Sequence, residues 1–405
     1  MKVLFLTLGK LDSINSSGIY TDMLRCFAEK GHEVYAVGAN EKRSGKPTAL
    51  SVDLGVNLLN VKIGNITKCG LIEKGISTLQ VESKYKKAIK KYFKSVKFDL
   101  ILYSTPPITF AKVVEYVKKR DGATTYLILK DIFPQNAVDI GVLRKSGLKG
   151  VLYKFFRRKE KNLYKLSDKI GCMSQANVDY VLANNPEVDK NKVEISPNSI
   201  EVVEKSITID ERVRIRQKYD LPNDKKIFVY GGNLGKPQGI PFILECLRSQ
   251  KDSTDKYFLI VGNGTEYDKV ESFAKESNQQ NFKLLKYLPV EDYDLLVSAC
   301  DVGMIFLDHR FTIPNFPSRL LSYMQAKLPV LACTDDNTDI GKVITEGRFG
   351  WWGKSDNVQN FVDVIKSVDQ SDLNVLGENG FKYLIENYSI DKSVDGIISS
   401  ASKGE

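Results

Sequence analysis

Short β-rich runs alternate with helical patterns along the whole chain, and no other feature limits the possible fold as strongly. In the first half, the expected strands lie at 3–8, 33–37, 100–103, 125–129 and 169–173. In the second half, they lie at 226–230, 257–261, 302–306 and 329–332. Segments with helical periodicity, such as 20–30 and 108–120, separate them. Strands that alternate with helices form mostly parallel sheets covered by helices. We therefore expect an α/β fold with two doubly wound sheets.

The length of the chain and one break in its pattern predict two domains. A chain of 405 residues exceeds what a single hydrophobic core usually holds. The periodic pattern breaks at 194–200, where Pro197 and Asn198 stand together. We expect one Rossmann-like domain over 1–196, a second over 197–383, and a C-terminal segment over 384–405. Because ligands of such sheets bind at the carboxyl ends of the strands, we expect the functional site in a cleft between the domains.

The six cysteines are scattered singly, and the chain has only two histidines. The cysteines are Cys26, Cys69, Cys172, Cys246, Cys300 and Cys333. This usage argues against a zinc site and against a disulfide framework, and it favours a reducing, cytoplasmic location. The apolar run at the amino terminus is too short for a signal sequence, so we interpret it as a buried first strand. No stretch reaches the ~18 to 20 apolar residues of a transmembrane helix. We expect a soluble or at most peripheral protein.

The net charge of +9 is concentrated in two basic, amphipathic helical segments, 84–97 and 149–165. Each segment has apolar residues on one helical face and lysines on the other. Taken alone, each fits a helix that packs on a sheet and exposes a solvated lysine face. Taken together, the two segments favour contact with anionic lipid. Nucleic acid is the weaker alternative, because neither segment lies in a recognisable nucleic-acid-binding module.

The segment 316–326, followed by an expected strand at 329–332, contains an arginine at the start of a helix. Pro317 is tolerated near a helix start, and Ser318 can serve as an N-cap. Arg319 would be disfavoured by the positive end of the helix dipole unless an anion binds there. The segment therefore predicts a phosphate site. The plainer alternative is an ordinary strand–helix unit with a surface arginine.

Three glycine-containing loops follow expected strands. The loop at 15–20 lacks the spacing of a dinucleotide fingerprint, which argues against a nicotinamide-dependent enzyme. The loops at 231–240 and 262–265 carry small residues that let backbone amides approach an anion. Each loop alone is more often a tight turn than a site. Together with the Arg319 segment they are more specific, because the strand ends of one domain meet at one edge.

At this point the chain resembles the retaining glycosyltransferases of family 4, and the resemblance covers nearly its whole length. It is carried by Ser17-Gly18, Asp131-Ile132-Phe133-Pro134-Gln135, Ser196-Pro197-Asn198, Gly232-Asn233-Leu234-Gly235 with Gln238-Gly239, Val261-Gly262-Asn263-Gly264, and Pro317-Ser318-Arg319 through Pro329-Val330. The resemblance implies the GT-B fold, in which two Rossmann-like domains face each other across a cleft. It also implies a C-terminal helix over 384–405 that crosses back to the N-terminal domain.

The resemblance further implies a function. It looks closest to the branch that builds capsule, O-antigen or exopolysaccharide repeat units. In that branch the C-terminal domain binds a nucleotide diphosphate sugar, here expected to be a UDP-sugar, and transfers a hexosyl group with retention. The N-terminal domain binds a polyprenyl-linked saccharide, at the inner face of the cell membrane. Neither a metal nor another cofactor is expected.

The resemblance also transfers residue roles. The candidate catalytic residues are Lys130, Asp131 and Arg319. The candidate donor-binding residues are Gly232, Asn233, Gln238, Gly262, Asn263, His309, Pro317, Ser318, Arg319 and Ser322. The candidate acceptor-side residues are Ser17, Gly18 and Tyr20. Asp131 could bond a sugar hydroxyl or instead cap the turn before the following proline.

Several positions depart from the family pattern. Asn233 and Gln238 replace an arginine and a lysine that neutralise the diphosphate in many members. Two frequent glutamates are absent at the positions near Pro314 and at Ser322. Arg319, with Lys236, would then have to neutralise the diphosphate together with backbone amides. Two alternatives stay open: a nucleotide-sugar 2-epimerase of the same fold, or a catalytically weak subunit that only binds a nucleotide sugar or a membrane.

Overall fold

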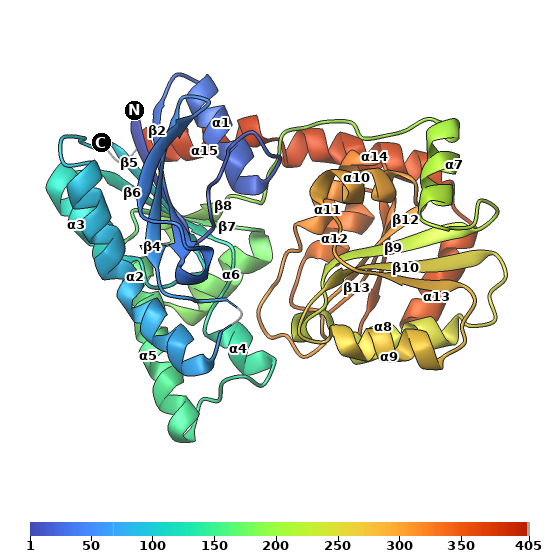
Figure 1. Ribbon diagram of the computed structural model, residues 1–405. Coiled ribbons are helices and arrows are strands. Elements are labelled where there is room, and N and C mark those ends of the chain that lie inside the picture. Colours follow the sequence, from blue (N-terminus) through green and yellow to red (C-terminus); the bar gives the residue numbers. More distant parts are fainter. Residues whose placement is uncertain (68, 403–405) are drawn as a thin grey trace. The chain divides into compact units, whose positions relative to one another are not determined.

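The computed structural model describes residues 1–67 and 69–402, and the chain divides into two compact units (Figure 1). Unit 1 comprises Met1–Glu201 together with Ser389–Glu405, and unit 2 comprises Val202–Tyr388. The chain therefore passes from unit 1 to unit 2 soon after the Pro197-Asn198 pair, and it returns to unit 1 at its C-terminal end. Each unit has its own sheet and its own hydrophobic core.

Unit 1 is built on an eight-stranded sheet with the strand order β3-β4-β2-β1-β5-β6-β7-β8. All neighbours pair in parallel except β3 and β4, which are antiparallel. The strands are β1 (Lys2–Leu6), β2 (Glu33–Glu41), β3 (Ala49–Asp53), β4 (Val56–Ile63), β5 (Leu100–Thr105), β6 (Thr124–Leu129), β7 (Lys169–Cys172) and β8 (Val193–Ile195). The central strands are buried along almost their whole length, because helices cover both faces of the sheet.

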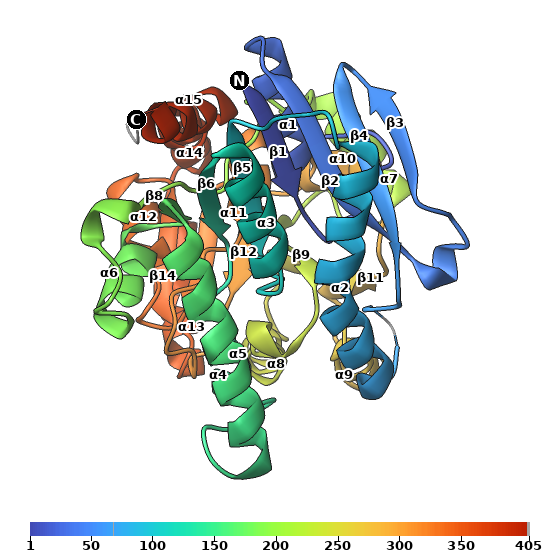
Figure 2. The ribbon, with the colours of Figure 1, turned by 90° about the vertical axis from the view of Figure 1, so that its left-hand side faces the viewer.

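The helices of unit 1 cover the two faces in two groups. Figure 2 shows α2, α3 and α5 on one face, whereas α1 and α15 pack against each other on the other. The helices are α1 (Ile19–Glu29), η1 (Lys42–Ser44), α2 (Leu71–Tyr92), α3 (Ala111–Asp121), α4 (Gln135–Asp139), α5 (Gly147–Leu166), α6 (Gln175–Asn184), η2 (Lys190–Lys192) and α15 (Ile390–Ser402). The C-terminal helix α15 thus belongs to unit 1.

Unit 2 is built on a six-stranded, fully parallel sheet with the order β11-β10-β9-β12-β13-β14. The strands are β9 (Lys226–Asn233), β10 (Lys256–Asn263), β11 (Phe282–Leu285), β12 (Val302–Phe306), β13 (Val330–Thr334) and β14 (Gly350–Lys354). The core under β9 and β10 includes Phe228 and Phe258, whose rings stack 5.2 Å apart. Both units have the α/β architecture with a largely parallel sheet that the alternating pattern predicts.

Helices also cover both faces of the unit 2 sheet. Figure 1 shows α8, α9 and α13 on one face and α10, α11 and α12 on the other. The helices are α7 (Ile209–Lys218), η3 (Lys236–Gln238), α8 (Ile240–Ser249), α9 (Tyr267–Glu276), α10 (Val290–Ser298), α11 (Arg319–Gln325), α12 (Ile340–Glu346), α13 (Val358–Asp369) and α14 (Leu373–Asn387). Because a strand, a loop and a helix alternate, every loop after a carboxyl strand end lies along one edge of the sheet.

The two basic segments differ in how they pack. In the second half of α2, Tyr85 and Ile89 are buried and the lysines Lys87 and Lys91 are exposed. This part of the chain is a helix packed on a sheet with a solvated lysine face. In α5, the apolar side chains of the last turns are buried, but those of the first turns are not. No helix of the described residues is both long enough and apolar enough to cross a membrane.

Candidate functional site

The loops after β9 and β10 are held side by side at the carboxyl edge of the unit 2 sheet. The two strands pair in register to their ends, so that Gly232 lies beside Gly262 and Asn233 beside Asn263. A Cβ atom on Gly262 would lie 1.9 Å from the carbonyl oxygen of Gly232. A glycine is therefore required at position 262 for the backbones to approach this closely. The sequence prediction that these four residues share one edge is confirmed by the strand pairing.

Arg319 lies against this pair of loops. It is the first residue of α11, and its Cζ atom lies 4.3 Å from the centre of the Tyr230 ring. A Cβ atom built on Gly232 would lie 3.2 Å from Arg319 Nη2. Arg319 Nη1 is buried and has no hydrogen-bond partner among the described residues. The guanidinium thus stacks on an aromatic ring and borders the glycine loop, instead of extending into solvent as a surface arginine does.

Tyrosines, and not carboxylates, surround this guanidinium. Tyr323 accepts a hydrogen bond from the Gly231 amide at 3.3 Å, and its hydroxyl lies 3.1 Å from the carbonyl oxygen of Met304. Tyr293, from α10, packs over Gly231, where an added Cβ atom would lie 1.8 Å from its hydroxyl oxygen. Burial raises the pKa of Tyr293 to about 12, although the charge of Arg319 opposes this rise. Among the described residues, no carboxylate forms an ion pair with Arg319, so its charge is not compensated by an acidic side chain.

Two expectations about the start of α11 need correction. The helix has only seven residues, and Ser318 is exposed and forms no side-chain capping hydrogen bond. Its backbone angles of −65° and −18° are already helical, whereas a capping serine needs extended angles. The capping role predicted for Ser318 is therefore wrong, and a dipole from so short a helix adds little. The charge that this segment offers an anion comes from the Arg319 side chain.

The amides of Asn233 and Gln238 close the first glycine loop on itself. Gln238 is buried, and its Oε1 atom accepts hydrogen bonds from Asn233 Nδ2 at 3.2 Å and from the Gly235 amide at 3.1 Å. Lys236, between them, is exposed. The exposed position weakens the expectation that Lys236 shares the neutralising role, and it leaves Arg319 as the half-buried cation beside this loop.

The remaining predicted donor residues lie on the loop after β12 and on α11. His309 is about half exposed, with its Nδ1 atom 3.9 Å from Asp308 Oδ1. Asp308 is held by Arg310, whose Nη2 atom donates to it at 2.7 Å. Pro317 directly precedes Ser318, and Ser322 follows Arg319 by one helical turn. Neither His309 nor Ser322 supplies the carboxylate that the family pattern has near this loop.

Sequence reasoning missed two further polar residues at this edge. Asp335, directly after β13, is completely buried, and burial raises the pKa of its carboxyl to about 6. Its Oδ1 atom accepts from the Asn337 and Thr338 amides, whereas Oδ2 is buried without a hydrogen-bond partner among the described residues. Asn315, before Pro317, likewise has a buried Nδ2 atom without a partner in the described part of the chain. No motif marks either residue in the sequence.

In unit 1, the predicted pair Lys130 and Asp131 follows β6. Lys130 Nζ donates to Asn198 Oδ1 and lies 5.3 Å above the centre of the Tyr20 ring. Burial lowers the pKa of Lys130 to about 7. Lys130 and the acceptor-side residue Tyr20 are therefore brought together, and Asn198 from the Pro197-Asn198 break joins them. A lysine with this pKa can gain or lose a proton near neutral pH.

Asp131 is also perturbed by its surroundings. Burial raises its pKa to about 6, although the hydrogen bond that it accepts from Asn136 Nδ2 at 2.7 Å opposes this rise. Helix α4 has Pro134 at its N-cap position and no side-chain capping bond. Asp131 is thus not the cap of the helix that follows. Instead it accepts a hydrogen bond from a side chain within that helix.

The first glycine loop of unit 1 is fixed by two charged residues. The Gly18 amide donates to Asp22 Oδ1 at 2.9 Å, and Arg25 donates to the carbonyl oxygens of Ile14 and Ser16. Ser17 is exposed at the tip of this loop. The loop is therefore held rigidly, with its hydroxyl and backbone open to solvent, at the carboxyl end of β1.

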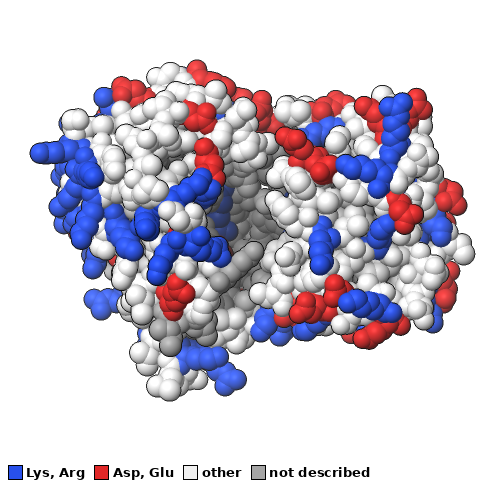
Figure 3. Space-filling model, in the orientation of Figure 1, with Lys and Arg blue, Asp and Glu red and all other residues white. Residues whose placement is uncertain are grey.

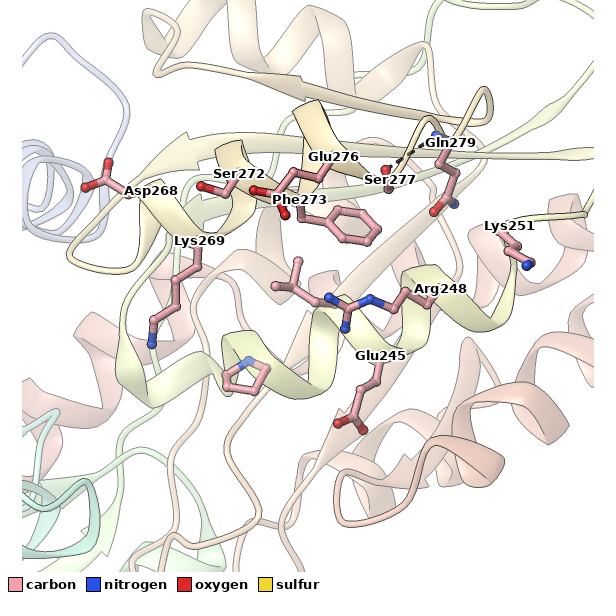
Figure 4. Close-up of a pocket in the computed structure, with 12 residues that line it drawn as sticks. Glu245, Arg248, Lys251, Asp268, Lys269, Ser272, Phe273, Glu276, Ser277 and Gln279 are labelled. Carbon is pink, nitrogen blue, oxygen red and sulfur yellow. Dashed lines mark hydrogen bonds between the residues drawn. The ribbon is translucent and has the colours of Figure 1, made fainter.

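A groove of about 880 Å³ lies between α8 and α9 and contains none of the predicted donor residues. Figure 4 shows acidic and basic side chains mixed along it, including Glu245, Arg248 and Lys269. The Arg248 guanidinium stacks 5.2 Å from the centre of the Phe273 ring, at the last turn of α8. Because this turn lies at the amino end of the strands, Arg248 is remote from the Arg319 edge. Among the described residues, no group of three potential metal-ligating side chains was found.

Comparisons with known proteins agree with this architecture. Residues 211–383 match the family model of "Glycosyl transferases group 1". The chain is 24% identical to "Probable glycosyltransferase WbjE" of Pseudomonas aeruginosa over 335 residues, which cover 81% of this chain and 80% of the relative. A shorter segment of 89 residues, 22% of this chain and 21% of the relative, is 32% identical to WcaI of Escherichia coli (strain K12), whose name assigns it to colanic acid biosynthesis.

Solved structures show the same fold at low sequence identity. Sucrose-phosphate synthase from Thermosynechococcus elongatus matches with a TM-score of 0.77 at 12% identity, covering 99% of this chain and 98% of that one. HepE of Anabaena, in complex with UDP and glucose, matches with a TM-score of 0.70 at 14% identity over the full length of both chains. Each unit thus has the Rossmann-like architecture of the GT-B fold. The chain is thus similar to group 1 glycosyltransferases in the segment 211–383, and to a probable glycosyltransferase over a stretch that covers 81% of its length.

Proposed function

We propose that this protein is a retaining hexosyltransferase that moves a sugar from a nucleotide diphosphate sugar, preferably a UDP-sugar, to a lipid-linked saccharide. The name of WbjE supports glycosyl transfer, and the name of WcaI, which assigns that protein to colanic acid biosynthesis, supports a role in surface polysaccharide assembly, such as capsule or O-antigen synthesis. The UDP complex of HepE supports a uridine nucleotide as the donor carrier. The proposed place of action is the inner face of the cell membrane, with segments 84–97 and 149–165 toward anionic lipid.

The observation that carries the proposal is the uncompensated charge of Arg319 beside the glycine loops. A buried Nη1 atom without a partner is costly unless a ligand fills that role. Arginine matches a phosphate group in both charge and geometry. We propose that Arg319 binds the diphosphate, together with backbone amides at Gly232 and Gly262. The side chains of Asn233 and Gln238 act by holding the shape of this loop.

The proposed reaction requires stabilisation of a leaving diphosphate. The bond between the anomeric carbon and the diphosphate oxygen breaks, and the acceptor oxygen forms a bond to the same carbon on the same face. The acceptor proton passes to the departing diphosphate oxygen, so no separate base is needed. Negative charge grows on the diphosphate as the bond breaks, and a preorganised guanidinium stabilises it. Because Arg319 supplies this cation, we expect turnover without a divalent metal.

The acceptor is assigned to unit 1. Ser17, Gly18 and Tyr20 lie at the carboxyl end of β1, and Lys130 and Asp131 lie at the carboxyl end of β6. A half-buried lysine and carboxylate with pKa values of about 7 and about 6 can exchange hydrogen bonds with sugar hydroxyls. We propose that Tyr20 provides an apolar surface for the sugar ring while Lys130 and Asp131 orient its hydroxyl groups.

Calorimetric titration with UDP, GDP and TDP, without and then with magnesium, tests the proposal. We expect one diphosphate to bind selectively without metal, and its sugar conjugate to bind as well. Incubation with that conjugate should then release the free diphosphate, and acceptor extracts should accelerate the release. Absence of binding across the panel would refute the donor site.

One observation favours a second candidate, a catalytically weak subunit that binds a nucleotide sugar. Ser322 occupies a position where the family pattern has a carboxylate, and no acidic residue lies between Pro314 and Ser322. The two candidates differ in turnover. Selective binding of a nucleotide sugar, with neither hydrolysis nor transfer, would favour the binding subunit over the transferase.

A further inference from the structure

The first turns of α5 carry an apolar stripe that faces solvent. Leu148, Val151, Leu152 and Phe155 have exposed fractions of 93%, 68%, 45% and 41%. Their spacing of three, four and seven residues places all four on one helical face. Figures 1 and 2 both show this end of α5 projecting from the rest of unit 1. An apolar side chain exposed singly is ordinary, but a continuous stripe on a projecting helix marks an interaction surface.

The opposite face of α5 shows that the stripe is not a displaced core face. Gly150, Glu160 and Tyr164 are buried on that side, whereas Leu163 is buried where the last turns continue the line of the stripe. Glu160 accepts hydrogen bonds from Arg157 and from the Tyr164 hydroxyl. The helix is therefore fixed by its last turns, and these contacts orient the stripe away from the sheet. Phe155 contacts the ring of Phe156, with 5.4 Å between the ring centres, whereas Leu148, Val151 and Leu152 stay exposed.

The charged residues of the segment that carries the stripe, 141–158, are all positive. Between residues 141 and 158 there are six arginines and lysines and no aspartate or glutamate. Lys149 and Lys154 are exposed and flank the stripe on its two sides, and Arg158 extends one flank. No ion pair of these three residues is found within the described part of the chain. At this tip, Figure 3 shows blue and white atoms.

We propose that the α5 stripe inserts into the surface of an anionic lipid bilayer, with Lys149, Lys154 and Arg158 at the level of the phosphate groups. A helix with an apolar face and lysines on both flanks lies in the plane of such an interface, where the long basic side chains extend toward the headgroups. The lack of acidic residues over 141–158 is complementary to an anionic surface. It argues against a protein interface in which charges of both signs are paired. The inference rests on the proposed function in one respect: a lipid-linked acceptor gives the enzyme a substrate at a membrane.

The proposal assigns different roles to the two basic segments. In the segment 84–97, the large apolar side chains Tyr85, Ile89 and Phe93 are buried while lysines are exposed, so this segment can add long-range attraction but no insertion. In α5, apolar and basic groups are exposed together. Each lysine or arginine near an anionic surface raises partitioning roughly fivefold at low salt. The apolar contribution, unlike the ionic one, persists when salt screens the charges.

Vesicle sedimentation of the full chain tests the inference. One set of vesicles contains phosphatidylcholine alone, and the other contains phosphatidylcholine and phosphatidylglycerol at a ratio of about 3 to 1. We expect binding at least roughly tenfold stronger to the anionic vesicles. The double variant Leu148→Ser/Val151→Ser should lose about tenfold of this binding, and the loss should persist at high salt. Lys149→Glu/Lys154→Glu should lose about as much at low salt only.

A matched control separates insertion from general charge. Lys87→Glu/Lys94→Glu makes the same change in net charge on two exposed lysines in and after α2. It should weaken binding less than the α5 charge variant does. The inference is overturned if the wild-type protein does not bind anionic vesicles, or if Leu148→Ser/Val151→Ser binds as tightly as wild type. It is also overturned if light scattering shows a dimer that this variant dissociates, since the stripe would then bind a second copy.

The vesicle assay contains no nucleotide and no acceptor. UDP titration of Leu148→Ser/Val151→Ser, carried out without vesicles, should match the wild type and thereby show that the variant is folded. A protein that binds vesicles but no nucleotide diphosphate would refute the proposed function and keep the lipid surface. The reverse result would refute the lipid surface alone.

Discussion

Replacement of Arg319 by methionine should separate phosphate recognition from nucleoside recognition. Methionine has a similar length, so it can still pack on the Tyr230 ring, from which the guanidinium carbon lies 4.3 Å. The substitution removes one charge and the unpartnered Nη1 donor. A hydrogen bond to a charged group contributes about 1.5–3 kcal/mol, and a charge pair at 4 Å contributes up to about 4 kcal/mol near a protein surface. We therefore expect a loss of about 3 kcal/mol in UDP binding, or roughly 100-fold.

Calorimetric titration with UDP and with uridine measures the two contributions on the same protein. Uridine has no phosphate, so its affinity for Arg319→Met should stay within about twofold of the wild-type value. Arg319→Lys keeps the charge but loses the planar, bidentate geometry, and we expect an intermediate loss of about tenfold. Arg248→Met is the matched control, because it removes a cation stacked on Phe273 at the other end of the strands. It should bind both ligands as the wild type does.

Three results would refute this reasoning. Equal losses for UDP and uridine in Arg319→Met would mean that Arg319 shapes the site without contacting the diphosphate. Unchanged UDP affinity would mean that the diphosphate lies elsewhere. A large fall in thermal stability of Arg319→Met alone, with Arg319→Lys unaffected in both stability and UDP binding, would assign the side chain to packing over Tyr230.

Three further predictions concern the backbone and the titrating pair. Gly262→Ala should lower the stability of unit 2 by roughly 2–4 kcal/mol, because the added Cβ would lie 1.9 Å from the Gly232 oxygen. Gly396→Ala is the control, because nothing lies within 4 Å of a Cβ at that position. In calorimetry, the control should leave the melting temperature unchanged or slightly raised. The value of kcat/KM should rise as Asp131 ionises near pH 6 and fall as Lys130 loses its proton near pH 7. Asp131→Asn should abolish the rise on the acid side. An unaltered pH profile in this variant would exclude a role for Asp131. Between pH 7 and 10.5 the Lys130 side chain is protonated in the unfolded chain and neutral in the folded one, so this residue makes the unfolding free energy increase with pH. Denaturant unfolding of Lys130→Met across this pH range should show a smaller increase of the unfolding free energy with pH. An increase equal to that of the wild type would contradict the lowered pKa.

The sequence predicted most of the buried strands and missed the four edge strands, β3, β8, β11 and β14, together with the interior strand β4. Strands β1, β5, β6, β10 and β12 are nearly continuous apolar runs, because both faces of a parallel sheet are covered. Strand β3 was missed because it is antiparallel and largely exposed, and its side chains carry no burial signal. Strands β8 and β11, with three and four residues, are too short for a recognisable pattern. Strands β4 and β14 were missed because the strands with which they pair are brought beside them only by the tertiary fold.

The backbone of the candidate donor site was more predictable than its side-chain environment. Glycines after strands allow close approach of the chain, and the sequence predicted that the loops containing Gly232 and Gly262 meet at one edge of a sheet. The three tyrosines around Arg319 come from β9, α10 and α11, which are far apart in the sequence. Tyrosine at each of these positions is compatible with an ordinary core residue. Their common neighbour therefore becomes visible only in the folded chain.

The three tyrosines around Arg319 also bear on the proposed donor site, which lacks the charged groups that the family pattern has there. With glutamates nearby, a guanidinium would be partly neutralised, and a second cation would be needed to bind two phosphates. Here Tyr230, Tyr293 and Tyr323 hold Arg319 without neutralising it, so its full charge stays available. The neighbouring loop is closed by the neutral amides of Asn233 and Gln238. We therefore propose that the missing cations and the missing carboxylates compensate each other, because a single unpaired arginine can replace a larger set of opposing charges in binding a diphosphate.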